Sequence, residues 1–190
     1  MRKYISDSEW RRFFSAITGS VNELRDKTML KMTYRHGLRV SELTGLKVTD
    51  VDLMGKTIYI RRLKNGFSTV HPLQDETCSL LERWIKKRQQ NIMDKDNDWL
   101  FISSRGNRLS RQWIYRLCNK YSIKAGFSLV VHPHMLRHAC GYALANQGLD
   151  TRLIQDYLGH RNITHTVRYT ASNPARFIRA WQSVQNDTGI

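Results

Sequence analysis

The residues best suited to chemistry lie in the C-terminal third of the chain. His134 and Arg137 are three positions apart, so on a helix they would project from one face, and Pro133 suits the first helical position. His160 and Tyr169 follow further along. Arginine binds phosphate oxygens through its planar fork, histidine carries protons, and a tyrosine hydroxyl becomes nucleophilic where cations stabilise its phenolate. Together these residues predict attack on a phosphodiester, although each histidine alone fits an ordinary surface or core position.

The charge of the chain favours a nucleic-acid partner. Its 190 residues include 31 Lys and Arg against 16 Asp and Glu, which gives a net charge of +15. This length is expected for one domain with a core that needs neither disulfides nor metal. A basic membrane-surface protein is the alternative, but the charge is spread along the chain and no basic amphipathic helix stands out. We therefore expect binding to DNA or RNA phosphates.

Cysteine spacing and hydropathy exclude several other classes of protein. Cys78, Cys118 and Cys140 are an odd number at wide spacing, which predicts buried apolar side chains rather than a disulfide framework or a metal knuckle. No apolar run approaches the roughly 18 residues of a membrane span, and the N-terminus lacks the apolar stretch of a signal peptide. These features favour a protein of the reducing cytoplasm.

The N-terminal part is predicted to be helical and to carry a further candidate cation. A capping box at residues 6–9 opens the first helix, and a second helix covers about residues 22–35. After Gly37 another helical turn begins, with Arg39 at its start and Glu42 one turn on. That spacing allows the carboxylate to hold the guanidinium in place. Taken alone, Arg39 is better explained as an exposed arginine without a special role.

Residues 56–73 change to strand character. Residues 56–60 alternate between polar and apolar side chains, Asn65-Gly66 supplies a hairpin turn, and residues 67–70 form the return strand. Lys64 lies next to the tip of this hairpin. A lysine in such a place is usually solvated, but a β-hairpin tip can also bring its ammonium to a DNA backbone or to a leaving oxygen.

The remaining segments are predicted to be helical, apart from a short extended stretch at 99–102. Helices are expected at about 75–90, after the N-cap Ser110, from 134 to Gly148, over 151–158, 164–170 and about 175–184. The outer face of the helix after Ser110 carries Arg111, Arg116 and Lys120 and could sit in a DNA groove, or it could simply be solvated. The predicted fold class is mainly α with a small antiparallel β-sheet, in one domain spanning 1–190.

The whole pattern resembles the catalytic domain of the tyrosine recombinases, the phage-integrase family, over roughly residues 6–182. The matching motifs are GLRVSEL (37–43), the hairpin lysine, HMLRH (134–138), LGH (158–160) and RYT (168–170). HxxR or LGH alone is a weak signal, and the resemblance depends on all the motifs occurring in family order. The chain looks most like the fimbrial phase-variation recombinases of enteric bacteria, which invert a promoter segment, and RYTASNPARF is similar to that subgroup.

The resemblance implies a catalytic set drawn from all of these motifs: Arg39, Lys64, His134, Arg137, His160 and Tyr169. The arginines would hold the non-bridging oxygens of the scissile phosphate, the histidines would complete these contacts and handle protons, and the lysine would protonate the leaving 5′-oxygen. The tyrosine would attack and leave a 3′-phosphotyrosyl link, while Glu42 supports the first arginine. No cofactor or metal is implied, because the cations take the electrostatic role that Mg²⁺ has elsewhere.

The resemblance also implies partners. Four protomers would act on double-stranded DNA with inverted-repeat sites, aided by DNA-bending proteins, at the nucleoid in the bacterial cytoplasm. The apolar helix at 175–184 is the candidate for exchange between protomers, or it packs on its own core. One departure from the family is expected: the first arginine motif starts at residue 37, so the separate N-terminal core-binding domain would be absent. Independent recognition of a DNA site is then in doubt.

Other functions stay open on the sequence. A type IB topoisomerase-like enzyme and an integrase or transposon recombinase share the same chemistry. Replication-initiator and relaxase nucleases pair His-x-His with a tyrosine, and His132-Pro133-His134 fits that string, although it leads directly into a helix. The last alternative is a basic DNA-binding regulator that keeps the fold without catalysis. The complete set of expected polar residues argues against this regulator.

Overall fold

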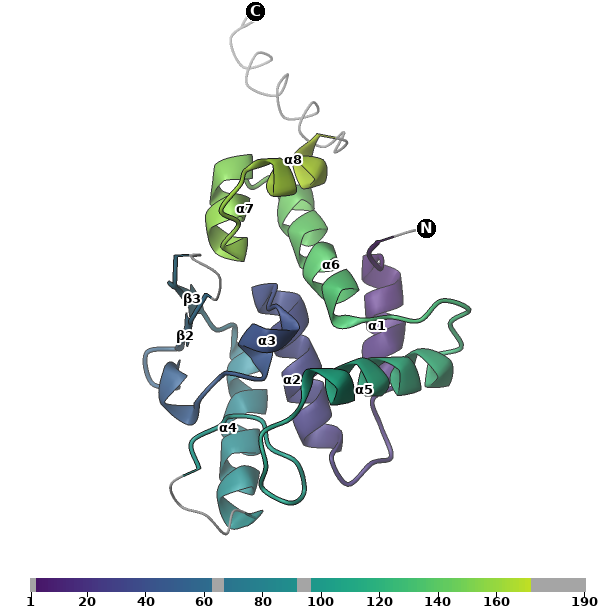
Figure 1. The fold of residues 1–190 in the computed structure, drawn as a ribbon, viewed down its shortest axis with the longest axis vertical. Coiled ribbons are helices and arrows are strands. Elements are labelled where there is room, and N and C mark those ends of the chain that lie inside the picture. The colour runs from purple at the N-terminus through teal and green to yellow at the C-terminus, as the bar shows by residue number, and fades with distance from the viewer. Residues whose placement is uncertain (1–2, 63–66, 92–96, 172–190) are drawn as a thin grey trace, which may run out of the picture.

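The structure is a computed structural model that describes residues 3–62, 67–91 and 97–171 (Figure 1). The helices in chain order are α1 (Asp7–Ser15), α2 (Glu23–His36), α3 (Val40–Leu43), the short 3-10 helix η1 (Val48–Asp50), α4 (Asp75–Asn91), α5 (Arg111–Lys124), α6 (Pro133–Asn146), α7 (Thr151–Leu158) and α8 (Thr164–Thr170). Within the same residues, the strands β1 (Val51–Asp52), β2 (Thr57–Ile60) and β3 (Thr69–Pro72) pair antiparallel in the order β1-β2-β3. The predicted class, mainly α with a small antiparallel sheet, is confirmed.

Two helices begin where side-chain caps predict. Ser6 and Glu9 form a reciprocal capping box at α1, in which the backbone N–H of Glu9 donates to Ser6 Oγ at 3.3 Å and that of Ser6 donates to Glu9 Oε2 at 2.8 Å. At α5, Ser110 Oγ accepts from the backbone N–H of Trp113 at 3.1 Å. These bonds satisfy N–H groups that the first helical turn leaves without partners.

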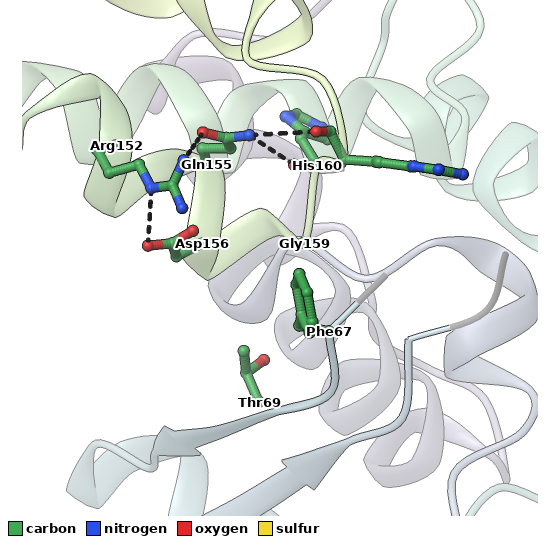
Figure 2. Close-up of a pocket in the computed structure, with 8 residues that line it drawn as sticks. Phe67, Thr69, Arg152, Gln155, Asp156, Gly159 and His160 are labelled. Carbon is green, nitrogen blue, oxygen red and sulfur yellow. Dashed lines mark hydrogen bonds and ion pairs between the residues drawn. The ribbon is translucent and has the colours of Figure 1, made fainter. Parts of the chain in front are cut away.

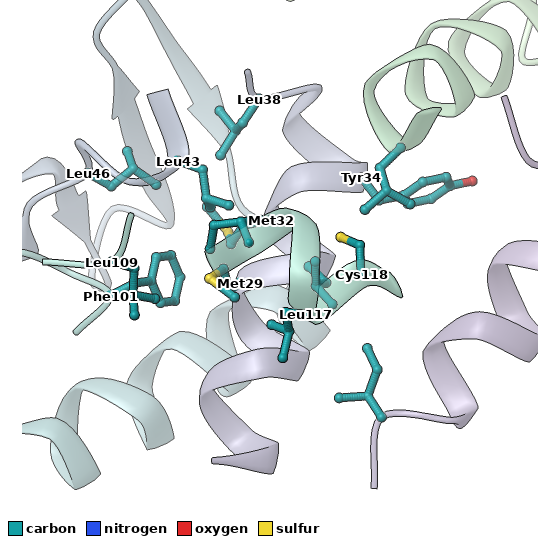
Figure 3. Packing of buried hydrophobic residues seen from close by; sticks show 14 of the residues in the cluster. Met29, Met32, Tyr34, Leu38, Leu43, Leu46, Phe101, Leu109, Leu117 and Cys118 are labelled. Atoms are coloured by element: carbon teal, nitrogen blue, oxygen red, sulfur yellow. The ribbon is translucent and has the colours of Figure 1, made fainter. Parts of the chain in front are cut away.

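Helix α2 is the centre of the main core. It packs against α1, α4 and α6, so its buried positions occur around the whole helix rather than along one stripe. Figure 3 shows Met29 and Met32 of this helix among Leu43, Phe101 and Leu117 from segments far apart in the sequence, all of them in one hydrophobic cluster. This core carries the segments that bear the candidate residues.

A charged pair on α2 is buried in the same region. Arg25 and Asp26 are almost fully buried, and the hydroxyl of Tyr121 donates to Asp26 at 2.8 Å. Arg25 also donates to the carbonyl of Ile102 at 3.0 Å. The polar groups that the fold buries here therefore have partners, as burial of charge requires.

The C-terminal helices form a second, smaller cluster. Figure 1 shows α7 and α8 beside the C-terminal half of α6. Cys140, Ala145, Ile154, Leu158 and Tyr169 are buried together there. This cluster contains residues of two motifs that the sequence singles out, Leu158 of LGH and Tyr169 of RYT.

The strand prediction missed one strand of the sheet, and the short extended stretch at 99–102 pairs elsewhere. The missed strand is β1: its residues 51–52 pair with residues 57–58 of β2 across a tight turn. Residues 99–102 do not join that sheet: Trp99 bridges to Lys47 and Ile102 to Arg108 as isolated pairs. The predicted turn at 64–66 and the helix at 175–184 lie outside the described residues. Of the cysteines, Cys118 and Cys140 are buried as predicted, and Cys78 is partly buried. None of the described helices has the length and apolar character needed to cross a membrane.

Candidate active site

A buried carboxylate gathers the candidate arginines. Glu42 is 3% exposed. Its Oε1 accepts from Nη1 of Arg39 at 2.7 Å, and its Oε2 accepts from Nη1 of Arg62 at 2.8 Å. Nη1 of Arg137 lies 3.8 Å from Oε2. In the described part of the chain, three guanidinium groups therefore share one carboxylate, and the cluster keeps a positive excess that suits an anionic ligand.

The protonation states agree with this arrangement. Burial by itself would raise the pKa of Glu42, but the charges of Arg62 and Arg137 and the hydrogen bond from the backbone of Arg39 outweigh it, so that pKa lies below its usual range. Burial, together with the neighbouring Arg39, lowers the pKa of Arg137 to about 10. The carboxylate and the guanidinium both stay charged at neutral pH.

Arg137 is held between the ends of two helices. Its Nη1 donates to the carbonyl of Gly37, just after α2, and its Nη2 donates to the carbonyl of Leu158, the last residue of α7, at 2.7 Å. Carbonyls at a helix C-terminus have no partner within the helix and carry partial negative charge. Arg39 reaches the carbonyl of Gly159 at 3.5 Å. The two predicted arginines therefore lie side by side around Glu42.

Arg62 belongs to this cluster, and our sequence analysis missed it. It follows β2, and its Nη2 donates to the carbonyl of Tyr157 in α7. Gly159, the C-cap of α7, has φ 62°, a conformation that glycine adopts without strain. A Cβ atom there would lie 2.7 Å from Nε of Arg62, so the close approach of the arginine also requires glycine. The sequence does contain a signal for Arg62. Side chains alternate between the two faces of a strand, so Arg62 lies on the same buried face as Ile58 and Ile60.

His160 lies at the border of two hollows. Its Nδ1 is 2.9 Å from Oγ1 of Thr166, and its carbonyl accepts from Nε2 of Gln155 at 2.9 Å. One hollow is a cavity of about 350 Å³. Figure 2 shows Phe67 on its β3 side and Gln155, Gly159 and His160 on its α7 side. A more open hollow next to it is lined by both His160 and Arg39. Burial, and then Arg137 and Arg39, lower the pKa of His160 to about 3, so its ring is neutral at physiological pH.

Tyr169 is buried beside these groups. It is 1% exposed, and its ring lies 6.3 Å from that of His160 and 5.1 Å from that of Tyr142, measured between centroids. Its hydroxyl lies 2.8 Å from Nδ1 of His138, a residue to which our sequence analysis gave no role. Burial raises the pKa of Tyr169 to about 12, although Arg137 acts in the opposite direction. The expected stabilisation of the phenolate by cations is therefore present, but in this conformation burial outweighs it.

His134 lies on the more exposed side of α6. Its ring is edge-on to that of His138 at 5.3 Å, and both residues line a hollow of about 480 Å³ with Lys3 and Arg168. Partial burial and the charge of Arg137 lower the pKa of His134. His134 thus neighbours the site from the surface.

The other candidates fall into two groups. Arg111, Arg116 and Lys120 are exposed on α5, whose contacts with α3 bring that helix close to the arginine cluster. Lys64 lies outside the described residues. Within residues 3–62, 67–91 and 97–171, no group of three or more His, Cys, Asp or Glu side chains is placed to hold a metal ion.

Comparisons with known proteins find relatives over most of the chain. The phage integrase family matches residues 3–176. The type 1 fimbriae regulatory protein FimE of Escherichia coli K12 is 52% identical over 181 residues, which are 95% of this chain and 91% of FimE. FimB of the same strain is 47% identical over 95% of this chain and 90% of FimB. The resemblance to the fimbrial recombinases is confirmed.

Solved structures show the same fold. The crystal structure of XerA recombinase has a TM-score of 0.81 and 31% identity, over 96% of this chain and 65% of the XerA chain. XerH site-specific recombinase bound to its palindromic difH substrate has a TM-score of 0.80 and 25% identity, over 94% of this chain and 52% of that one. Since the family match extends over most of the sequence and close relatives cover nearly all of it, the chain belongs to the phage integrase family of tyrosine recombinases.

Proposed function

We propose that the protein is a site-specific recombinase that cleaves and rejoins DNA through a 3′-phosphotyrosyl intermediate and inverts a promoter segment controlling fimbrial or other surface genes. The observation that carries this proposal is the shared Glu42 carboxylate, which brings Arg39 and Arg137 together beside His160 and Tyr169. These residues come from four separate motifs of the sequence. The relation to FimE and FimB supports the biological setting.

The arginines stabilise the charge that develops on the scissile phosphate. Glu42 neutralises part of the guanidinium charge, and the remaining positive charge is fixed in a largely buried site where electrostatic interactions are strong. Arg39 keeps a partly exposed side chain that can reach a phosphate oxygen. With Nδ1 engaged by Thr166, His160 offers Nε2 to a second oxygen. His134 completes these contacts from the surface side.

Tyr169 attacks the phosphorus, and the 5′-oxygen leaves. The ammonium of Lys64, at the hairpin tip implied by the family motif, protonates that oxygen. Because the phosphodiester is kept as a phosphotyrosyl ester, a strand from another duplex can be joined without ATP. The phenol is buried here, so the scissile phosphate must gain access to its hydroxyl before attack.

The proposed activity requires DNA and protein partners. We propose that four protomers act on a pair of inverted-repeat DNA sites at the bacterial nucleoid, with the C-terminal segment at 175–184 exchanged between neighbours and with DNA-bending proteins as aids. The solved XerH complex with its DNA substrate supports binding to duplex DNA. The charge of +15 supports it independently, because phosphate neutralisation drives such affinity.

Incubation with a nicked suicide substrate tests the chemistry. The expected product is a covalent adduct at the 3′-phosphate whose peptide contains Tyr169, formed in the presence of EDTA and absent from Tyr169→Phe. A 5′-linked or EDTA-sensitive adduct would assign the protein to the initiator or relaxase nucleases. DNA binding without any adduct would leave a non-catalytic regulator.

A plasmid carrying a promoter between inverted repeats tests the biological outcome. Inversion is read from the orientation of the segment after incubation or expression. Relaxation of the plasmid without recombinant product would favour a type IB topoisomerase activity instead.

A further inference from the structure

We infer that His138 is a further catalytic residue of this protein: its Nδ1 takes the proton from the hydroxyl of Tyr169 as that tyrosine attacks the phosphate. The inference rests on the proposed function, since it needs Tyr169 to be the nucleophile. It adds a named proton acceptor to a site in which the family motif assigns proton handling to His134 and His160.

The geometry of the pair carries the inference. The Tyr169 hydroxyl and Nδ1 of His138 are 2.8 Å apart, which is within the reach required of a general base. In the tautomer with its proton on Nε2, His138 accepts the hydroxyl hydrogen. Among residues 3–62, 67–91 and 97–171, this imidazole is the hydrogen-bond partner that the hydroxyl has.

The backbone of α6 sets the position of the phenol. Gly141 has no side chain, and a Cβ atom there would lie 2.6 Å from the Tyr169 ring. The ring can therefore lie directly against the helix, while Tyr142 packs edge-on against it. The hydroxyl then meets His138, one turn before Gly141 on the same helix. A buried nucleophile and its base are thus placed by one helix.

The other histidines are less well placed for this proton. His160 lies with its ring stacked 6.3 Å from that of Tyr169, and its Nδ1 is occupied by Thr166. His134 approaches His138 rather than the phenol, with ring centroids 5.3 Å apart. His134 can pass a proton from His138 toward the surface through the hollow that both line.

The surrounding charges keep the His138 ring able to accept a proton. Burial, followed by the neighbouring cations, lowers the pKa of His138 to about 4, so the ring is neutral at pH 7. The groups that face it are His134 and Arg137 on its own helix, Arg168 and Tyr169 on α8, and Lys3 of the N-terminal segment. A DNA phosphate bound at Arg137 would counter these cations and raise the pKa of His138, which strengthens it as a base.

Cleavage transfers one proton to His138 and takes one from Lys64, and rejoining reverses both transfers. The O–H bond of Tyr169 breaks and its proton goes to Nδ1 of His138, a bond forms between the tyrosine oxygen and phosphorus, and the bond from phosphorus to the 5′-oxygen breaks. The electron pair leaves with that oxygen, which takes a proton from Lys64. In rejoining, the 5′-hydroxyl gives its proton to the neutral amine of Lys64 and attacks phosphorus. The bond from phosphorus to the tyrosine oxygen breaks, and the imidazolium of His138 returns its proton to the departing phenolate.

A bridging-sulfur substrate tests the inference. Single-turnover cleavage of the nicked DNA is compared for the wild-type protein and His138→Asn, because asparagine keeps a hydrogen-bond acceptor near Nδ1 but cannot take a proton. Adduct formation by the variant should be about 10²–10⁴-fold slower. The defect should persist when sulfur replaces the leaving 5′-oxygen, since a thiolate departs unprotonated. The same sulfur should relieve the defect of Lys64→Ala, and the pH dependence of the wild-type rate at its acid side should vanish in His138→Asn.

Controls separate the possible failures. Tyr142→Phe removes a hydroxyl from a ring that packs on Tyr169 and should cleave at the wild-type rate. His138→Ala with added imidazole is the second variant, and a rate that rises with the concentration of neutral imidazole supports the inference. The role of His138 alone is overturned if the wild-type protein forms the adduct and His138→Asn forms it at the same rate. It is overturned equally if the bridging-sulfur substrate restores the rate of His138→Asn. Absence of the wild-type adduct overturns the proposed function and this inference with it.

Discussion

Arg62 and Glu42 form an ion pair in which both partners are buried: Nη1 of the arginine lies 2.8 Å from Oε2 of the carboxylate, and the side chains are 0% and 1% exposed. Such a pair contributes little stability by itself, because the cost of removing both charges from water offsets their attraction. Its contribution here is positional. It connects the end of β2 to the start of α3, where Arg39 lies, and through the carbonyl of Tyr157 to α7.

Removal of either partner should reveal this coupling. Arg62→Met and Glu42→Gln should each lower the free energy of unfolding by about 3–5 kcal/mol, because each leaves the other group buried and short of a partner. The loss of unfolding free energy in the double variant should be smaller than the sum of the two single losses by at least about 1 kcal/mol. Urea unfolding of the four proteins measures the coupling. Strict additivity would show that the two side chains act independently.

Arg137→Lys should cleave slowly while binding DNA normally. Lysine carries one nitrogen and cannot bridge the carbonyls of Gly37 and Leu158 while facing a phosphate. We expect about 100-fold slower adduct formation, the cost of a lost oxyanion contact. Because burial and Arg39 already lower the pKa of the native arginine to about 10, the lysine should lose its charge at a lower pH, and the defect should deepen as pH rises. A variant with the wild-type rate and pH profile would contradict this role.

Gly141→Ala should displace the nucleophile. The new methyl group would lie 2.6 Å from the Tyr169 ring, so the ring has to leave its position. Such overpacking should lower the free energy of unfolding by about 1–3 kcal/mol. The pKa of Tyr169, about 12 in the native protein, should fall toward its ordinary value near 10 as the phenol meets water. Ultraviolet titration against the matching Tyr169→Phe proteins isolates this one tyrosine; a pKa that remains near 12 would mean the helix yields instead.

Acid should destabilise the protein through a buried histidine pair. Nδ1 atoms of His36 and His71 are 3.3 Å apart, and burial lowers the pKa of each to about 3. The unfolded chain takes up these protons near pH 6.5, so the stability is complete above that pH and is lost as pH falls toward 3. Each group adds about 1.4 kcal/mol per pH unit to the slope in that window.

His71→Gln isolates one of these protons. Urea unfolding at several values between pH 7 and pH 4 should give a slope smaller by about 1.4 kcal/mol per pH unit than that of the wild type, whatever the stability of the variant at pH 7. Parallel pH curves for the two proteins would show that His71 is not protonated differently in the folded and unfolded states.

The exposed face of α5 should contribute phosphate contacts. Replacing Arg111, Arg116 and Lys120 with Gln should reduce DNA affinity and make the slope of log K against log salt less steep by about 0.9 for each lost contact. The control has the same change in charge elsewhere: Lys56, Arg83 and Lys86 replaced with Gln. Equal losses in the two triple variants would assign the effect of α5 to net charge alone.

The sequence by itself determined the local elements and the family. Capping at Ser6 and Ser110 and the left-handed stop at Gly159 depend on residues within one turn of each other, so they can be recognised from spacing alone. The ordered motifs likewise identify the recombinase family, because their residue types and order survive without coordinates. The convergence of Arg39 and Arg137 was expected on that resemblance.

Only the tertiary structure decided which similar residues enter the site. Arg61 and Arg62 are adjacent and chemically identical, yet the first side chain is 55% exposed and the second 0%, because α3 and α7 close over one face of the β2 end. The hydrogen bond between His138 and Tyr169, and the burial that raises the pKa of that phenol, also depend on how α8 docks on α6. Exclusion of water from a surface is a property of several segments at once, and no single stretch of sequence contains it.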